Sequence, residues 1–272
     1  MKPVELFVTC MVDAFRPTAG IAAVRVLERR GAEVRFPQDQ TCCGQFSYNG
    51  GYHHEAAQLA RHFVAVFESS AHPIVALSGS CAAMVIHEYP SLIAEDVTFT
   101  GGSPEEAADW KKRAVQVGMR VLELSQWIMQ QGTGEEPDDA KPVISSVVLH
   151  QGCHMRRLLK ANQEPEAALR QSGLQPMTVE DDDQCCGFGG TYSMTEWKVS
   201  TALADAKWDN VKKVVQEHDA MCLTSADLGC LLHLDGRQSR LGETFPVLYL
   251  AEVIDQADQR GKGGADGRNT SR

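Results

Sequence analysis

The sequence lacks any long apolar run, and no stretch of its 272 residues approaches the roughly 18–20 apolar residues that a membrane-spanning helix needs. No signal peptide precedes Val4, so we expect a cytoplasmic protein whose thiols stay reduced. Basic residues are also scarce, because 26 Lys and Arg stand against 36 Asp and Glu, for a net charge of −10. That balance argues against a nucleic-acid backbone or an anionic membrane as the main partner.

Several common cofactor motifs are missing as well. No two cysteines have the Cys-x2–4-Cys spacing usual in zinc sites, and there is no ferredoxin-type Cys-x2-Cys-x2-Cys-x3-Cys run. The segment 187–190, Gly-Phe-Gly-Gly, does not have the spacing of a dinucleotide-binding fingerprint. Because we find no flavin or nicotinamide site, we do not expect the chain to oxidise a substrate alone.

What the sequence does contain is nine cysteines, eight of which form two sets of four in one register. Each set begins with the spacing Cys-x31-Cys-Cys-Gly and ends with one more cysteine. The residue numbers of equivalent cysteines in the two sets differ by 143 (153 − 10 and 185 − 42). For the final cysteine of each set the difference is 149 (230 − 81). The sets are Cys10, Cys42, Cys43 and Cys81, and Cys153, Cys185, Cys186 and Cys230. This register indicates an internal duplication.

Hydrophobic patterning predicts an α/β fold in two similar halves, each a small parallel sheet flanked by helices. The expected strands are residues 4–9, 33–36, 73–77, 143–149, 176–179 and 220–224. The expected helices are residues 17–30, about 52–67, 104–131, 154–171, 193–216 and 246–259. Each cysteine group then falls just beyond the C-terminal end of a strand, where open α/β sheets bind their ligands.

The repeat and one polar segment set the expected domain boundaries. We expect a first domain at residues 1–131 and a second at 143–260, each long enough to bury a core. The segment 132–142 is polar and rich in Gly and Pro, as a linker would be. Residues 261–272 carry no apolar residue beyond Ala265, so we expect a disordered tail.

Four thiolates per half fit one iron–sulfur cluster per half, because a cluster offers different iron atoms to two adjacent cysteines. Gly44 and Gly187 would let the backbone turn tightly and present amides to sulfide. The alternatives are eight buried structural cysteines, a strained vicinal disulfide at each pair, or a zinc-bound structural module. Cys222 has no counterpart in the first half, and we expect a buried structural thiol there.

The pattern Cys-x31-Cys-Cys-Gly, followed after an apolar segment by the positions of a Cys-x-x-Cys pair, resembles the cysteine-rich CCG domain. That domain occurs in a subunit of heterodisulfide reductase, in glycolate oxidase iron–sulfur subunits and in the lactate utilization protein A family. The resemblance spans nearly the whole chain, in two copies. A stand-alone chain without the ferredoxin run is most similar to the lactate utilization protein A family.

This resemblance implies an iron–sulfur electron-transfer subunit of a complex that oxidises L-lactate to pyruvate. It further implies that the eight repeated cysteines bind the clusters, and that a ferredoxin-type iron–sulfur subunit and a third subunit are partners. The rivals are a heterodisulfide or thiol–disulfide reductase-like subunit, a glycolate oxidase iron–sulfur subunit, and the zinc module.

The sequence departs from the full CCG pattern at one position in each half. The first cysteine of the final Cys-x-x-Cys is Ser78 in the first half and Asp227 in the second. The five-cysteine motif is associated with the noncubane cluster of heterodisulfide reductase, which cleaves disulfides. With four thiolates per half, one ordinary [4Fe–4S] cluster is the more economical interpretation, although Asp227 could still supply an oxygen ligand. The departure favours electron transfer over disulfide reduction.

Two further features near the second set leave alternatives open. His150 and His154 flank Cys153 and could contact a cluster or serve as hydrogen-bonding neighbours. The acidic run 180–183 could be a solvated loop or a docking site for a basic redox partner.

Overall fold

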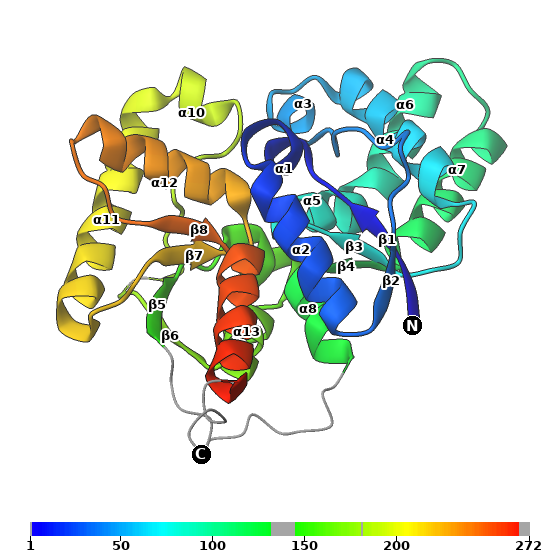
Figure 1. Ribbon diagram of the computed structural model, residues 1–272. Coiled ribbons are helices and arrows are strands. Elements are labelled where there is room, and N and C mark those ends of the chain that lie inside the picture. The colour runs from blue at the N-terminus through cyan, green and yellow to red at the C-terminus, as the bar shows by residue number, and fades with distance from the viewer. Residues whose placement is uncertain (1, 132–144, 181, 267–272) are drawn as a thin grey trace.

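The computed structural model describes residues 2–131, 145–180 and 182–266, with side chains as far as residue 260. Two four-stranded sheets form the framework, with strand orders β2-β1-β3-β4 and β6-β5-β7-β8, and all their pairings are parallel. The two halves therefore share one plan and lie side by side (Figure 1). The predicted α/β fold with two similar halves is confirmed, whereas the predicted linker 132–142 lies outside the described residues.

The first sheet follows the apolar runs of the sequence. Its strands are β1 (Lys2–Phe7), β2 (Ala32–Arg35), β3 (Ile74–Ala76) and β4 (Val121–Glu123). Its helices are α1 (Cys10–Phe15), α2 (Pro17–Arg29), α3 (Gln45–Asn49), α4 (His53–Phe67), α5 (Gly79–Ala83), α6 (Tyr89–Phe99), α7 (Pro104–Gly118) and α8 (Leu124–Gln130), with a π-helical turn η1 (Met84–Glu88). Helix α2 begins at Pro17, whose missing N–H costs nothing in the first turn, and it buries Ala19, Ala23 and Leu27.

The second half repeats this order with fewer helices. Its strands are β5 (Ser145–Leu149), β6 (Leu174–Thr178), β7 (Leu223–Ser225) and β8 (Val247–Tyr249). Its helices are α9 (Glu164–Gln171), α10 (Tyr192–Thr195), α11 (Trp197–His218), α12 (Leu228–Arg240) and α13 (Leu250–Asp266), with a π-helical turn η2 (Met155–Leu159). Helix α13 continues past Gly261, where we expected the tail to begin, and residues 267–272 lie outside the described residues.

Three of the expected helices are wrong in their extent. The expected helix 104–131 is α7, strand β4 and α8, and the expected helix 246–259 begins with strand β8. The expected helix 154–171 is interrupted at Lys160, which has a φ of 54° and caps η2 before α9 begins. Strands as short as β4 and β8 cannot show a repeating pattern, so in the sequence they merged with the helices that follow them.

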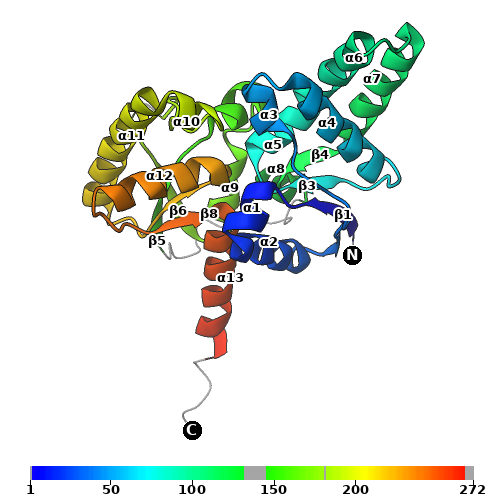
Figure 2. The same cartoon turned by 90° about the horizontal axis from the view of Figure 1, so that it is seen from above.

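Helices α6 and α7 have no counterpart among the described elements of the second half, where α12 leads to β8. They pack against each other at the end of the first half that faces away from the second (Figure 2). The two halves therefore diverge after their last cysteine, while the parts that carry the cysteines keep one plan.

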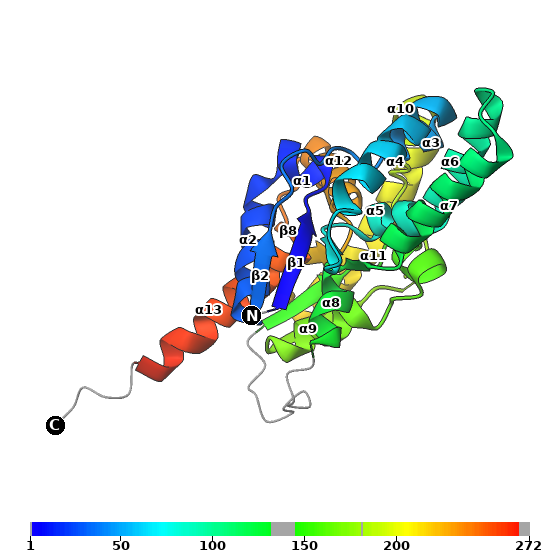
Figure 3. The same cartoon turned by 90° about the vertical axis from the view of Figure 1, so that its right-hand side faces the viewer.

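The halves are joined by an extensive apolar interface. Helix α2 of the first half packs against α13 of the second, and α8 packs against α9. Leu27, Trp127, Leu169 and Ile254 belong to one buried apolar cluster that includes residues of both halves. A second cluster, which contains Phe63, is centred on the first half. The outer end of α13 projects away from both halves (Figure 3).

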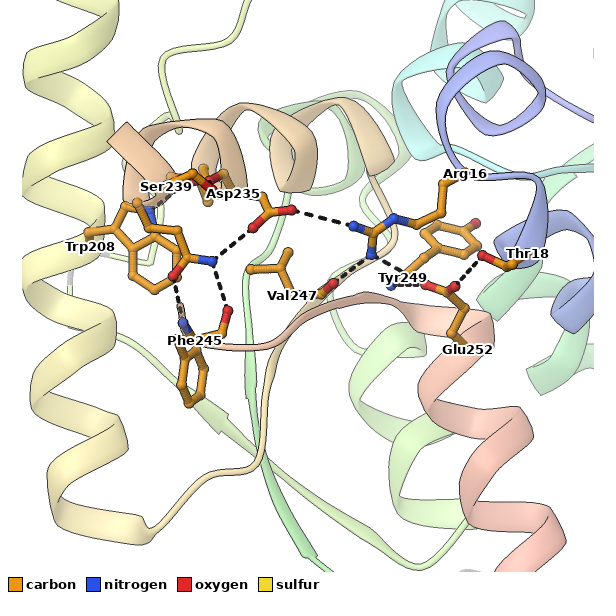
Figure 4. A network of polar contacts seen from close by, with 11 residues as sticks. Arg16, Thr18, Trp208, Asp235, Ser239, Phe245, Val247, Tyr249 and Glu252 are labelled. Carbon is orange, nitrogen blue, oxygen red and sulfur yellow. Dashed lines mark hydrogen bonds and ion pairs between the residues drawn. The ribbon is translucent and has the colours of Figure 1, made fainter. Parts of the chain in front are cut away.

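Ion pairs cross the same interface. Arg16 donates to the carbonyl of Val247 (2.5 Å) and pairs with Asp235 (3.4 Å) and Glu252 (3.6 Å), as Figure 4 shows. Thr18 donates to Glu252 (2.9 Å) in the same network. These contacts tie the start of α2 to β8 and α13.

No helix in the described part of the chain combines the length and apolar character that a membrane span requires.

Candidate metal centres

The fold brings the first four cysteines to one place. Cys10 follows β1 at the start of α1, Cys42 and Cys43 lie in the loop before α3, and Cys81 lies in α5 after β3. The Sγ atoms of Cys10 and Cys42 are 3.4 Å apart, and those of Cys43 and Cys81 are 3.2 Å apart. Parallel strands end at a common edge of the sheet. These four side chains therefore meet beyond the C-terminal ends of the strands, as predicted.

The second four cysteines repeat the arrangement. The thiols of Cys153 and Cys185, of Cys185 and Cys186, and of Cys186 and Cys230 lie close enough to shift one another's pKa. None of the nine cysteines forms a disulfide. Each set therefore forms a compact group of four thiols.

Gly44 and Gly187 shape the two loops that carry the cysteine pairs. Their φ angles are 81° and 91°, in the left-handed region that glycine adopts without strain. A Cβ on Gly187 would lie 2.4 Å from the carbonyl oxygen of Ser200, so a side chain there would displace α11. In this turn the N–H of Gly44 points at Cys42 Sγ (3.4 Å) and that of Gly187 at Cys185 Sγ (3.3 Å).

One cysteine of each set has a lowered pKa, which favours its thiolate form. Hydrogen bonds from Cys10 and Cys43, aided by the Gly44 amide, lower the pKa of Cys42 to about 3. The neighbouring thiols of Cys153 and Cys186, aided by the Gly187 amide, lower the pKa of Cys185 to about 2. The same contacts raise the pKa of Cys10 and Cys153, because each of these thiols would give up its proton toward the neighbouring thiolate, and burial and repulsion between negative charges add to the rise. A bound cation would remove this repulsion and favour all four thiolates.

Ser78 and Asp227 occupy the positions of the fifth cysteine in the two halves, and their side chains are in contact across the interface between the halves. Asp227 Oδ1 accepts hydrogen bonds from Ser78 Oγ (2.9 Å) and from the backbone N–H of Ser80 (2.7 Å). Both Ser78 and Asp227 are buried. Asp227 belongs to the second half, yet it holds the first turn of α5, the helix that carries Cys81.

Three histidines lie beside the second set. A ring nitrogen of His150 and the Sγ atoms of Cys186 and Cys230 all lie within 4.8 Å of one another. His154 Nδ1 is 3.5 Å from Cys153 Sγ, and its Nε2 is 3.2 Å from Gln45 Nε2 of the first half. Burial, with Lys207 nearby, lowers the pKa of His150 to about 3, so the imidazole is neutral.

The third histidine, His233 on α12, was not identified from the sequence. Its ring is 5.9 Å from that of Phe188, between ring centroids, and Ser200 Oγ is 3.2 Å from its Nε2. His233 follows Cys230 by almost one helical turn in α12, so a prediction of α12 would have placed it near the second set.

The remaining candidates lie away from the two sets or are already paired. Cys222 is completely buried in the apolar cluster shared by both halves, and burial raises its pKa to about 12. In the acidic run, Asp182 pairs with Arg156, and Glu180 lies 3.6 Å from Lys213. Part of that run is therefore neutralised within the chain.

The donor set of each half fits a metal centre or an iron–sulfur cluster. Four thiols converge, one of them is already acidic, and a backbone amide points at its sulfur. Each set thus supplies four sulfur ligands, which is the number that a [4Fe–4S] cluster takes.

Comparisons with known proteins agree with this arrangement. The cysteine-rich domain family CCG matches residues 4–86 and 147–235, which contain both cysteine sets. The chain is 38% identical over 255 residues to lactate utilization protein A of Bacillus cereus (strain B4264), covering 93% of this chain and 98% of that protein. It is 36% identical over 257 residues to lactate utilization protein A of Halalkalibacterium halodurans, covering 94% and 98%.

Among solved structures, the fold is similar to that of a hypothetical protein from Helicobacter pylori, with a TM-score of 0.53 and 12% identity. That match covers 98% of this chain and 51% of the other, so the chain spans about half the length of that protein. The two matched segments, each centred on one set of four thiols, and the full-length relatives together show that this chain belongs to the lactate utilization protein A family of CCG cysteine-rich domain proteins.

Proposed function

We propose that the chain is a cytoplasmic iron–sulfur electron-transfer subunit of a complex that oxidises L-lactate to pyruvate. The observation that carries this proposal is the pair of four-thiol groups, one beyond the strand ends of each sheet. The relatives that the chain matches over nearly their whole length are named for lactate utilization.

In this proposal the first set, Cys10, Cys42, Cys43 and Cys81, and the second set, Cys153, Cys185, Cys186 and Cys230, each hold one [4Fe–4S] cluster. A bound cluster would accept and pass on one electron at a time. The chain's own contribution is to gather the thiolates, direct the Gly44 and Gly187 amides at sulfur, and surround the sites with buried side chains. Removal of water from a cluster and hydrogen bonds to its sulfurs both tune its potential.

The proposed partners supply what the chain lacks. Lactate oxidation releases two electrons and two protons, and the sequence contains no recognisable nucleotide site that would accept a hydride. We propose that a ferredoxin-type iron–sulfur subunit and a third subunit complete the complex. Disulfide reduction receives less support, because Ser78 and Asp227 occupy the fifth cysteine positions and are hydrogen-bonded to each other.

The test compares the isolated chain with the assembled complex. The anaerobically loaded chain alone should not reduce a dye with L-lactate, and activity should appear when the partner subunits are added. Cys42→Ala with Cys43→Ala, or Cys185→Ala with Cys186→Ala, should abolish that activity and leave one site loaded. Cys222→Ala is the matched control, because Cys222 lies in the apolar core, outside both sets. Lactate oxidation by the isolated chain would contradict the carrier role.

A further inference from the structure

The two cysteine sets occupy equivalent places but have different surroundings. The numbers of Phe7 and His150 differ by 143 (150 − 7), the offset that separates Cys10 from Cys153. Phe7 ends β1, and His150 follows β5 directly. Phe7 is fully buried in the apolar cluster that contains Cys43 and Cys81, and its ring lies 4.8 Å from that of Phe63. At this position the first half therefore has a hydrocarbon ring, in the same apolar cluster as two of its cysteines.

His150 gives the second set a polar neighbour at the same place. The residue is only 2% exposed, and its ring lies beside the sulfurs of Cys186 and Cys230. Neither ring nitrogen has a hydrogen-bond partner within the described ranges 2–131, 145–180 and 182–266. A buried, unpartnered imidazole is costly, so a partner is expected when the site is loaded. Sulfur is the acceptor that its position offers.

Two more positions show the same contrast. His154, beside Cys153, corresponds to Met11 (154 − 11 = 143), and His233 corresponds to Met84 (233 − 84 = 149, the offset of the last cysteine pair). Met84 is 1% exposed and lies in the apolar cluster of the first set. Imidazoles thus replace apolar side chains around the second set at three equivalent positions.

We infer that the second cysteine set is the site of higher reduction potential, and that His150 raises that potential by donating an N–H hydrogen bond to sulfur. This inference rests on the proposed function, because it requires a cluster in each half. Reduction adds negative charge to a cluster, and a donor aimed at its sulfur stabilises that charge. The four cysteines of the set already provide one thiolate for each iron, so the imidazole acts as a donor and not as a ligand.

The experiment is an EPR-monitored redox titration of the anaerobically loaded full-length chain. Cys42→Ala with Cys43→Ala leaves the second site to be measured alone, and Cys185→Ala with Cys186→Ala leaves the first. The second site should have the higher midpoint potential. His150→Phe, which installs the first-half residue, should shift the second site to lower potential and leave the first unchanged. His150→Gln keeps an N–H donor and should retain most of the potential, and exposed His218→Gln serves as a control.

Several results would overturn the inference. Equal potentials at the two sites would do so, as would an unchanged second site in His150→Phe protein that keeps its iron. An equal drop in His150→Gln would show that a donor is not the cause. If His150→Phe loses iron, pulsed EPR on protein that carries 15N only in histidine still decides: weak 15N coupling at the second site supports the donor, while no 15N coupling or the strong coupling of direct ligation contradicts it. Failure of the proposed function would show itself separately, as a wild type without iron or acid-labile sulfide.

Discussion

At the scale of single residues, Asp227 shows how one half positions the other's site. Its carboxylate receives the Ser80 N–H and the Ser78 hydroxyl at the start of α5, while its other oxygen, Oδ2, is buried without a partner among the described residues. Asp227→Ala should cost about 1–3 kcal/mol of stability, because the Ser80 N–H loses its buried acceptor. It should also lower iron in the first site more than in the second.

The measurement is iron content in the two single-site backgrounds, together with urea denaturation. Asp227→Asn keeps an oxygen acceptor and is the matched control. Equal iron loss at the two sites would indicate general unfolding and contradict the positioning role.

Glu123 provides a pH-dependent prediction at the same scale. Burial is the main reason that its pKa rises to about 8 from the usual 4.5, although Ser125 donates hydrogen bonds to its carboxylate that favour the charged form. Between these values the folded chain keeps a proton that the unfolded chain releases. The contribution of Glu123 to the free energy of unfolding is therefore complete below pH 4.5 and is lost as the pH rises through 8. The loss is at most about 1.4 kcal/mol per pH unit.

Glu123→Gln removes this titration and should flatten the fall in stability over that range. Urea denaturation of both proteins at pH 5, 6, 7 and 8, roughly the interval over which the two states differ in bound protons, would measure it. Parallel pH profiles for the two proteins would show that Glu123 stays ionised in the folded chain.

At the scale of elements, α13 connects the halves through its inner part. Arg29 pairs with Asp255, and Arg30 lies 3.0 Å from Asp258. Burial raises the pKa of Asp255, but hydrogen bonds from Arg29 and Gln259 outweigh it and hold that pKa below its usual value. These contacts all precede Arg260 in α13.

Truncation after Gln259 should therefore change stability by less than about 0.5 kcal/mol and leave iron content unchanged. Asp255→Ala should cost about 1–3 kcal/mol, because the partly buried Arg29 loses its nearest carboxylate and keeps only the contact to Asp258. Thermal melts of both variants compare them directly. A truncation as damaging as Asp255→Ala would show that the residues beyond Gln259 pack on the fold or on another molecule.

At the scale of the whole molecule, the two halves share one apolar core, in addition to the smaller cluster centred on the first half. The apolar cluster that joins Leu27 and Trp127 to Leu169 and Ile254 would be exposed if the halves were separated. Residues 1–131 expressed alone should therefore aggregate or fail to unfold cooperatively, and coexpression with residues 143–272 should restore a folded complex. Cooperative unfolding of residues 1–131 alone, with iron bound, would contradict this expectation.

The sequence predicted the duplication and the grouping of cysteines because their spacing is a direct record of both. It did not predict β4 and β8, since such short strands carry no periodicity, nor the hairpin of α6 and α7. The contact between Ser78 and Asp227 joins the two halves of the chain, so it follows only from how the halves pack. His150 was noted beside Cys153, but its closeness to Cys186 and Cys230 depends on strand order.

The central claim is that both cysteine sets hold clusters that receive electrons from lactate. The most direct measurement is EPR of the anaerobically purified intact complex, before and after addition of L-lactate, with iron and acid-labile sulfide measured on the same sample. The predicted result is iron and sulfide at both sets, with a cluster signal from this chain that changes on lactate addition and is lost when both sets are disrupted. A chain that holds only zinc, or clusters that dithionite reduces but lactate does not, would contradict the claim.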